Sequence, residues 1–479
     1  FMENQKTKII SIASIIALAL TLVTATFAYF MAQTGEGKST DIKINASTVD
    51  TLTFEAGSAI SLNLNQDNFA SGKGNQTGTT FAKAMLTANN KTNTATEHYY
   101  MYLDISENTF TYTQDENTPE ILLTIKDANG NAITSITGLT HKTVTDGKGA
   151  SISGFDITTK KEAITLFNNR EITANPTKTE QWNITVTFVN YNANQAGNAG
   201  KNFTAKLMIQ KEKILTLAEH VISQYTGTQG DNALYYHNST LTNGAGDNSY
   251  RYAGASDSVN NYICLGSDVA TCPDANLFRI IGVFGDQTKV IRAKSVGNKQ
   301  WHTSESNTWS SSSLNAYLNG EYLTSLGTLA DKIATTTWKA GGGIWSNIVT
   351  SVPKTAYQNE VGSSASSTTV DKKIGLMYVS DYYYSASPSA WTLVGYNESD
   401  ATKDYRAAKT INWLYLGSNE WTISRTSDIT PYAFGMFSTG LVSNYGVTLS
   451  FGVRPSFNLL SSVTYASGSG TSSDPIRIN

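Results

Sequence analysis

The chain has 479 residues, a formal net charge of −3 and only 15% charged residues. This length exceeds what one hydrophobic core usually supports, so we expect two to three domains. The weak, slightly acidic charge balance excludes the basic stripe that nucleic-acid binding requires, and we expect no nucleic-acid partner.

An apolar segment near the start predicts where the chain operates. Residues 9–32 are mostly apolar, and a short leader with Lys6 and Lys8 precedes them. A run of roughly 20 apolar residues spans a bilayer as a helix, and a basic leader favours the cytoplasmic side. We therefore expect residues 1–35 to be an export signal or a retained helix. The rest of the chain should then be extracellular, at the cell surface.

The fate of this segment stays open between three interpretations. As a secretory signal, it would be cleaved between Ala28 and Tyr29, with Thr26 at the −3 position. As a retained anchor, it is long enough to span the membrane. As a filament-core helix, it would pack against the same helix of neighbouring subunits.

The third interpretation rests on a resemblance to type IV pilins, which begin their mature form with Phe and carry Glu at the fifth position. Here Gln5 occupies that position, Glu3 is displaced, and Met2 is an alternative natural start. A buried unpaired ammonium is costly, so the leader lysines would need a neighbour's Glu3 as partner. The filament-core contacts would then come from Phe1, Glu3, Lys6 and Lys8.

Residues 36–211 are predicted to form an all-β sandwich. Strict alternation puts Trp182, Ile184, Val186 and Phe188 on one face, which is typical of a strand with one buried side. Many short strands separated by turn residues favour a two-sheet sandwich. The other predicted strands cover residues 41–45, 51–55, 61–65, 99–105, 121–125 and 203–209, with a hairpin turn at 127–130.

A connecting helix is predicted next. Residues 212–225 carry Ile214, Leu217, Val221 and Tyr225 on one stripe, and glycines end the pattern by residue 230. We therefore assign residues 212–230 to a linker helix between two domains. His220 on this helix is expected to pack rather than to bind.

Residues 231–479 are predicted to be an aromatic-rich α+β domain, since all but one of the eight tryptophans lie there. A hairpin is expected from 277–284 and 289–293 around Gly285. Helical spacing predicts a helix over 313–326, and a buried strand is predicted over 373–379.

The two cysteines, Cys264 and Cys272, lie close together in a loop-like stretch. In an exported chain such a pair predicts a local disulfide, and two cysteines are too few for a structural zinc site.

Catalytic motifs are weak. Ser351 and Lys354 form one S-x-x-K with Asp381 downstream, but no K-T-G follows and Pro353 disrupts the helical turn that such a nucleophile needs. The turn at Asp127 lacks the closing Glu of a calcium loop. We therefore predict no catalytic residue, no metal and no cofactor.

Aromatic side chains are the best candidates for recognition. Rings near Asp and Asn suit sugar stacking or protein contact, although the same rings would also fill a core that is poor in Leu and Ile. The candidate ligand aromatics are Tyr382, Tyr383, Tyr384, Trp391, Trp413 and Trp421.

The first half resembles the TasA/camelysin-type secreted fibre proteins. The resemblance rests on Ala28-Tyr29-Phe30 closing the apolar run, the early strand 47–52, and the final strand 202–211. It implies a jelly-roll-like sandwich that assembles into biofilm fibres, in which an N-terminal strand freed by signal cleavage completes a neighbour's sheet.

The second half resembles a domain of unknown activity that is widespread in surface proteins of gut Firmicutes. The matching residues are 250–254, 278–282, 413–415 and the Gly-Val-Arg-Pro ending at 452–455. The ending also looks like that of C-type-lectin-like and formylglycine-generating-enzyme folds. The resemblance implies a C-type-lectin-like domain that binds or displays. The two cysteines do not match a copper-binding catalytic pair.

Together these patterns predict a non-enzymatic structural subunit of a Gram-positive surface filament, either a pilus or a biofilm fibre, with an outward adhesive domain. The expected partners are other copies of the chain, the membrane before assembly, and a glycan or host-surface ligand. A membrane-anchored monomeric adhesin is the alternative. A hydrolase using Ser351 or Asp381 is the third interpretation.

Overall fold

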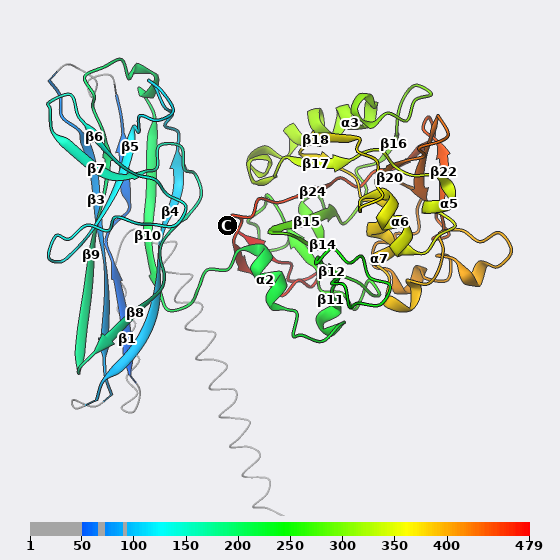
Figure 1. The fold of residues 1–479 in the computed structure, drawn as a ribbon, viewed down its shortest axis with the longest axis horizontal. Coiled ribbons are helices and arrows are strands. Elements are labelled where there is room, and N and C mark those ends of the chain that lie inside the picture. Colours follow the sequence, from blue (N-terminus) through cyan, green and yellow to red (C-terminus); the bar gives the residue numbers. More distant parts are fainter. Residues whose placement is uncertain (1–49, 66–71, 90–92) are drawn as a thin grey trace, which may run out of the picture. The chain divides into compact units, whose positions relative to one another are not determined.

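The computed structural model describes residues 50–65, 72–89 and 93–479 (Figure 1). The chain divides into two compact units, Phe1–Lys213 and Ile214–Asn479. The predicted export segment 1–35, the Ala28–Tyr29 junction, the filament-core contacts and the strand at 41–45 all lie outside the described residues. Within the described ranges, no helix is both long and apolar enough to cross a membrane.

The first unit is a sandwich of two antiparallel sheets, as the alternating sequence pattern predicts (Figure 1). One sheet has the order β1 (Thr51–Ala56), β3 (Gln76–Thr87), β9 (Thr177–Phe188), β5 (Ile121–Asp127), β7 (Ser151–Asp156), β6 (His141–Thr145). The other has the order β2 (Ile60–Asn63), β10 (Asn202–Gln210), β4 (Ala95–Asn108), β8 (Ile164–Ala174).

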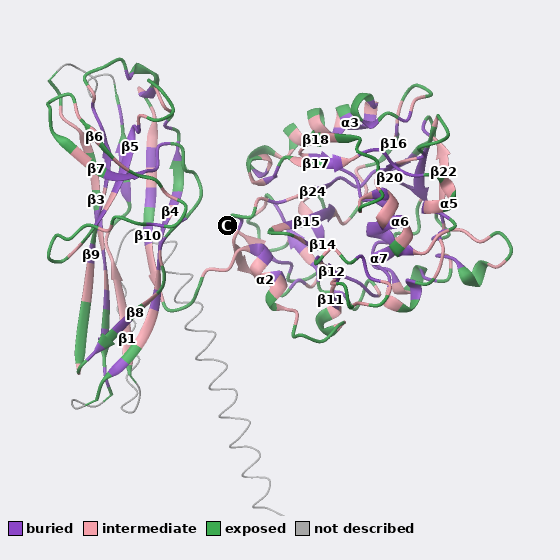
Figure 2. Cartoon of the chain, viewed as in Figure 1, coloured by how far each residue is buried: buried purple, intermediate pink, exposed green. Residues whose placement is uncertain are grey.

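Apolar side chains from both sheets form one core cluster. Figure 2 colours buried residues purple on strands of both sheets. The predicted face of β9 is buried, with Ile184 and Phe188 fully covered and Trp182 only 4% exposed. Met101 and Leu103 of β4 and Phe203 of β10 pack into the same core from the opposite sheet. Period-two alternation therefore places one side of each strand in a shared interior.

The predicted hairpin at 127–130 is a tight turn that is not followed by a paired strand. Asp127 accepts backbone N–H bonds from Asn129 and Asn131, and Gly130 has φ of 86°. The chain then makes only an isolated bridge between Lys126 and Ala132, because the next strand, β6, pairs with β7.

The connecting helix is shorter than predicted and belongs to the second unit. Helix α2 (Leu217–Ser223) begins only after Thr216, whose side chain accepts the Glu219 N–H while Glu219 accepts the Thr216 N–H. This capping box fixes the start of the helix five residues later than the apolar stripe predicts. Leu217 and Val221 lie in the core of the second unit.

The second unit contains two larger sheets, two two-stranded sheets and several short helices. The seven-stranded sheet contains β11 (Leu234–Tyr236), β12 (Tyr250–Tyr252), β14 (Leu277–Phe284), β15 (Gln287–Arg292), β24 (Ser456–Asn458) and β19 (Ile374–Gly375), with β13 (Tyr262–Cys264) beside β14. The five-stranded sheet contains β16 (Asn298–Gln300), β23 (Ser450–Gly452), β20 (Glu420–Arg425), β21 (Tyr432–Met436) and β22 (Val442–Gly446).

The remaining strands and the helices complete this unit. The small sheets pair β17 (Thr336–Lys339) with β18 (Thr369–Lys372) and β25 (Tyr465–Ser467) with β26 (Arg477–Ile478). The helices are α3 (Ser313–Tyr317), the π-helical turn η6 (Leu318–Tyr322), α4 (Leu323–Ser325), α5 (Trp345–Ile348), α6 (Pro353–Glu360) and α7 (Val379–Tyr384).

Two local predictions in this unit are confirmed and one is wrong. The hairpin around Gly285 forms from β14 and β15, and residues 313–325 are helical with a π turn in the middle. The strand predicted at 373–379 is limited to Ile374–Gly375. The Asp381 carboxylate accepts the Tyr378 N–H, which starts helix α7 where the apolar run suggests a continuing strand.

Candidate functional site

The six candidate ligand aromatics are all buried, each 1% exposed or less. Each ring donates its one polar hydrogen to a backbone carbonyl. The acceptors of Tyr382, Tyr383, Tyr384, Trp391, Trp413 and Trp421 are, in that order, the carbonyls of Gly440, Ile348, Asn243, Ala386, Tyr252 and Lys299. Covered rings with satisfied donors cannot stack on a ligand from solvent, so the structure corrects the recognition prediction in favour of core packing.

The predicted disulfide is present, because Cys264 and Cys272 are bonded. Cys264 ends strand β13, so the bond ties the following loop to the seven-stranded sheet. The S-x-x-K residues take part in local structure instead of a nucleophilic site. The Ser351 hydroxyl donates to the Ser346 carbonyl at 2.6 Å, and Pro353 starts helix α6, of which Lys354 is the second residue.

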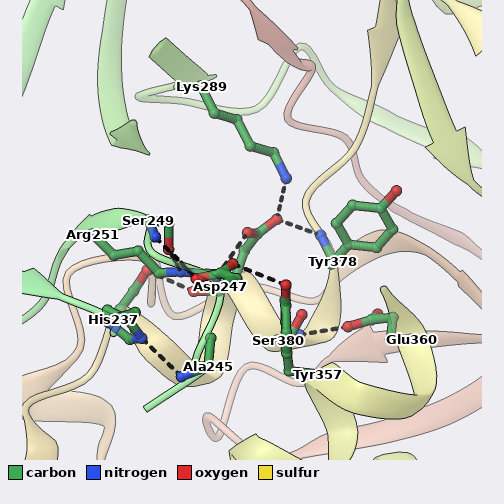
Figure 3. Close-up of polar contacts among 12 residues, drawn as sticks. His237, Ala245, Asp247, Ser249, Arg251, Lys289, Tyr357, Glu360, Tyr378 and Ser380 are labelled. Atoms are coloured by element: carbon green, nitrogen blue, oxygen red, sulfur yellow. Dashed lines mark hydrogen bonds and ion pairs between the residues drawn. The ribbon is translucent and has the colours of Figure 1, made fainter. Parts of the chain in front are cut away.

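Asp381, which the sequence suggested only as a weak enzymatic candidate, is the hub of a buried charged cluster. Figure 3 labels its partners Arg251, Lys289 and Tyr378. We call Asp247, Arg251, Lys289, Tyr357 and Asp381 the Asp381 cluster. Arg251 comes from β12, Lys289 from β15, Tyr357 from α6 and Asp381 from α7. Elements that are far apart in sequence thus meet at two carboxylates, with Lys289 and Arg251 at Asp381, and Arg251 and Tyr357 at Asp247.

The Asp381 carboxylate contacts two cations and one backbone donor. Lys289 Nζ donates to Asp381 Oδ2 at 2.6 Å, and the Tyr378 N–H donates to the same oxygen at 2.8 Å. Arg251 Nη1 lies 3.9 Å from Asp381 Oδ1. The carboxylate is therefore held on both oxygens, in a site where its side chain is 2% exposed.

Arg251 extends the cluster to a second carboxylate. Its Nη2 donates to Asp247 Oδ2 at 2.5 Å and its Nε donates to the Ser249 hydroxyl at 2.7 Å. The Tyr357 hydroxyl donates to the same Asp247 oxygen at 2.9 Å. Two cations and two carboxylates balance each other, which is the condition for burying charge at tolerable cost.

Burial and pairing compete for the ionisation of these groups. Burial lowers the pKa of Lys289, while the Asp381 carboxylate opposes that shift. Burial raises the pKa of Asp247, but the nearby Arg251 charge and the Ser249 hydrogen bonds outweigh it and hold that pKa well below its usual range. Asp247 is thus charged at neutral pH, whereas the ammonium of Lys289 is less favoured than in water.

Glu360 is the last residue of α6, and its carboxylate lies at the first turn of α7, beside this cluster (Figure 3). It accepts the N–H groups of Val379 and Ser380 at 2.8 and 2.9 Å, and also the Ser424 hydroxyl. Burial raises its pKa, against the hydrogen bonds that favour the charged form. Glu360 therefore caps α7 and joins that helix to strand β20.

His237 is a packed, neutral histidine. Its Nδ1 accepts the Ala245 N–H at 3.1 Å, and its ring lies 4.8 Å from Tyr384 and 5.1 Å from Trp391. Burial lowers its pKa well below the usual value, which disfavours the charged imidazolium. This geometry gives His237 a role in packing.

Of the described residues, no group of three or more His, Cys, Asp or Glu side chains is placed to hold a metal ion. The described surface does carry a shallow pocket of about 470 Å³. It is lined by Asn298, Lys299, Gln300, Thr303, Ser313, Leu314 and Ser450. None of the predicted aromatics lines it, and its polar side chains gave no motif in the sequence.

The Asp381 cluster links strands β12 and β15 to helices α6 and α7 through buried ion pairs and hydrogen bonds. Its sequence signal is a cation next to apolar or aromatic residues of a strand. Arg251 lies between two tyrosines in β12, and Lys289 precedes Val290 and Ile291 in β15. A cation at such a position predicts a buried partner, but it does not reveal which carboxylate provides it.

The whole chain was compared with protein-family models, with curated proteins and with solved structures. None of the three comparisons found a match.

Proposed function

We propose that this protein is a non-enzymatic, extracellular structural subunit of a bacterial surface filament, a pilus or biofilm fibre, whose second unit is an adhesive domain. The observation that carries the proposal is the outer edge of strand β1. This strand begins at Thr51, is the first described strand of the sandwich, and has no neighbouring strand on its outer side among the described residues.

An open edge offers unpaired backbone groups to another chain. Gly57 N–H bonds to the Phe81 carbonyl, which makes the pair next to the end of β1 a hydrogen-bonded one. Because bonding alternates along an antiparallel ladder, the N–H groups of Leu52, Phe54 and Ala56 point away from β3. These three donors are available to an extended segment from a second copy.

Two further observations support the proposal. The Cys264–Cys272 disulfide is typical of proteins in an oxidising, extracellular environment. Charged residues of the second unit that could take part in catalysis, such as Lys289 and Asp381, form ion pairs with each other in the interior. Both features suit a durable surface protein better than an enzyme.

The finer fold assignments belong to the same proposal. We infer a jelly-roll-like arrangement for the sandwich and a C-type-lectin-like arrangement for the second unit. The Gly-Val-Arg-Pro ending supports the latter, since Arg454 is buried, donates to Glu420 and the Leu414 carbonyl at 2.6 Å each, and joins strands β23 and β24. These buried contacts of Arg454 give the Gly-Val-Arg-Pro ending a structural role.

The filament proposal is tested by blocking the β1 edge. Ala56→Pro removes one outward N–H while leaving the β3-facing bonds, and proline is tolerated on edge strands. Ala56→Val is the matched control, because it keeps the donor. We expect electron microscopy of material released from cells to show filaments for the wild type and Ala56→Val, and few or none for Ala56→Pro. Monomers alone in the wild type would refute the proposal.

A membrane-anchored, monomeric glycan-binding protein is the second candidate. The polar pocket around Lys299 and Gln300 favours it, since exposed amide, hydroxyl and ammonium groups can bind sugar hydroxyls. Binding of the intact chain to a glycan array without filaments, and its loss in Gln300→Ala, would support this candidate. Intact mass of the mature protein would also show whether residues 1–28 are kept.

A further inference from the structure

We propose that the Lys289 amine and the Asp381 carboxyl group condense into an intramolecular isopeptide bond, which makes this pair a self-modification site. The two side chains already touch, with 2.6 Å between Nζ and Oδ2. They are 6% and 2% exposed, respectively, so water is excluded from the contact. The inference is independent of the proposed filament.

Burial makes the Lys289 ammonium easier to deprotonate than it is in water. Its Nζ lies 4.6 Å from the ring centre of Tyr378, 5.5 Å from Trp338 and 5.6 Å from Phe284, and these ring faces attract the ammonium. Burial nevertheless outweighs the attraction of the Asp381 carboxylate and lowers the pKa of Lys289. Transfer of one proton along the existing hydrogen bond to Asp381 then yields an amine beside a carboxylic acid, the two reactants of amide formation.

The surroundings of Asp381 hold the carboxyl carbon in place for attack. Tyr378 N–H fixes one oxygen, and the Arg251 guanidinium lies beside the other. Arg251 is itself held by Asp247 and Ser249. A fixed cation and a backbone donor stabilise the negative charge that develops on oxygen when the amine adds. Holding both reactants in contact supplies the proximity that bimolecular amide formation lacks in water.

The reaction balances without a further reagent. The Nζ lone pair forms the bond to Asp381 Cγ, and one carboxyl C–O bond breaks. The leaving oxygen departs as water, carrying two of the three protons of the original ammonium. The product is a secondary amide with one N–H. No oxidation or reduction takes place.

The bond would join two segments separated by 92 residues. It would connect strand β15 covalently to the start of helix α7. Closing a long loop restricts the unfolded chain, so this link would stabilise the second unit beyond what an ion pair provides.

The chain contains a matched internal control. Lys294 and Asp274 also lie 2.6 Å apart, but their side chains are 63% and 70% exposed. Water solvates both side chains there, as at an ordinary surface ion pair. We therefore expect the buried pair to condense and the exposed pair to remain an ion pair.

The test is mass spectrometry of the purified, folded full chain after disulfide reduction. We expect the mature chain to be lighter than its sequence by one water. A tryptic digest should contain residues 280–292 joined to residues 374–403, with Lys289 uncleaved and cleavage after Lys294 intact. Lys289→Arg keeps the positive charge but cannot condense, so it should restore the full mass.

Two results would overturn the proposal. One is recovery of the two peptides separately, with cleavage after Lys289. The other is a water loss confined to a single peptide, which would indicate an internal succinimide instead of a cross-link. Because the decisive measurement uses the wild-type protein, it does not depend on whether any variant folds.

Discussion

The interiors of the two units differ in the kinds of residues that they bury. The first unit buries Ile, Leu, Val and Phe from alternating positions of long strands, including Ile184, Leu123 and Phe203. The second unit relies on short elements and buries ion pairs such as Lys289–Asp381 and Arg454–Glu420. The first core is therefore mainly apolar contact between continuous sheets, and the second combines a large apolar core with buried ion pairs between short segments.

This difference predicts which kind of mutation each unit tolerates. A hydrophobic core loses stability in proportion to the volume removed. A core with buried charges is most sensitive to removal of one partner, because the other charge is left unpaired in a poorly polarisable site. The following four predictions test this contrast, from the largest expected effect to the smallest.

Asp381→Ala should have the largest effect. It leaves the charges of Lys289 and Arg251 buried without their shared partner. We expect the free energy of unfolding to fall by about 3–5 kcal/mol. Urea denaturation followed by tryptophan fluorescence measures it, since all tryptophans except Trp182 report on the second unit. Asp274→Ala, at an exposed pair, should change the free energy by about 1 kcal/mol or less. Equal effects would contradict the contrast.

Ile184→Ala tests the apolar core of the first unit. Its side chain is fully buried between the sheets, so truncation should cost about 2–5 kcal/mol. The adjacent, exposed Asn183 offers the control, with a change of about 0.5 kcal/mol or less for Asn183→Ala. Far-UV circular dichroism in urea measures both. A small effect of Ile184→Ala would mean that this core is not close-packed.

Asp247→Asn tests the charge balance as a function of pH. The folded-state pKa of Asp247 lies below that of the unfolded chain. Its stabilisation is therefore complete above about pH 4 and is lost as pH falls toward the lower folded value. We expect the free energy of unfolding of the variant to be about 1–3 kcal/mol lower than that of the wild type at neutral pH. On acidification the variant should lose less stability than the wild type does, because it lacks the titrating carboxylate. Parallel pH dependences, measured by urea denaturation between about pH 2 and 7, would argue against this pairing.

Thr216→Ala should have the smallest effect. It removes the side-chain oxygen that accepts the Glu219 N–H at the start of α2, at a cost of about 1 kcal/mol. Thr216→Ser keeps the hydroxyl and should be nearly neutral. Thermal unfolding compares the two variants. Equal melting temperatures would show that the cap contributes nothing to the second unit.

Most of the first unit could be predicted from its residues. Alternation identified β9 and its buried face because one covered side of a strand imposes period two. The same reasoning failed at residues 373–379, where an apolar run continues into helix α7. The Asp381 side chain bonds to the Tyr378 N–H and determines the change, and an apolar pattern carries no sign of that bond.

The candidate site was predicted much less well. The aromatic residues at 382–384 stood out in the sequence, but they fill the core. The cations that surround Asp381 were overlooked, although Arg251 lies between two tyrosines and Lys289 precedes Val290 and Ile291. Their partner is 92 residues from Lys289, and no local pattern records a contact over that distance.

The sequence by itself determined the strand periodicity of the sandwich and the local Cys264–Cys272 pair, because both depend on neighbouring residues. Only the tertiary structure decided that six prominent rings face inward and that Lys289 meets Asp381. Burial and long-range pairing depend on how separate elements pack together. The physical reason is that a side chain's charge state and reactivity follow from its surroundings, which distant segments provide.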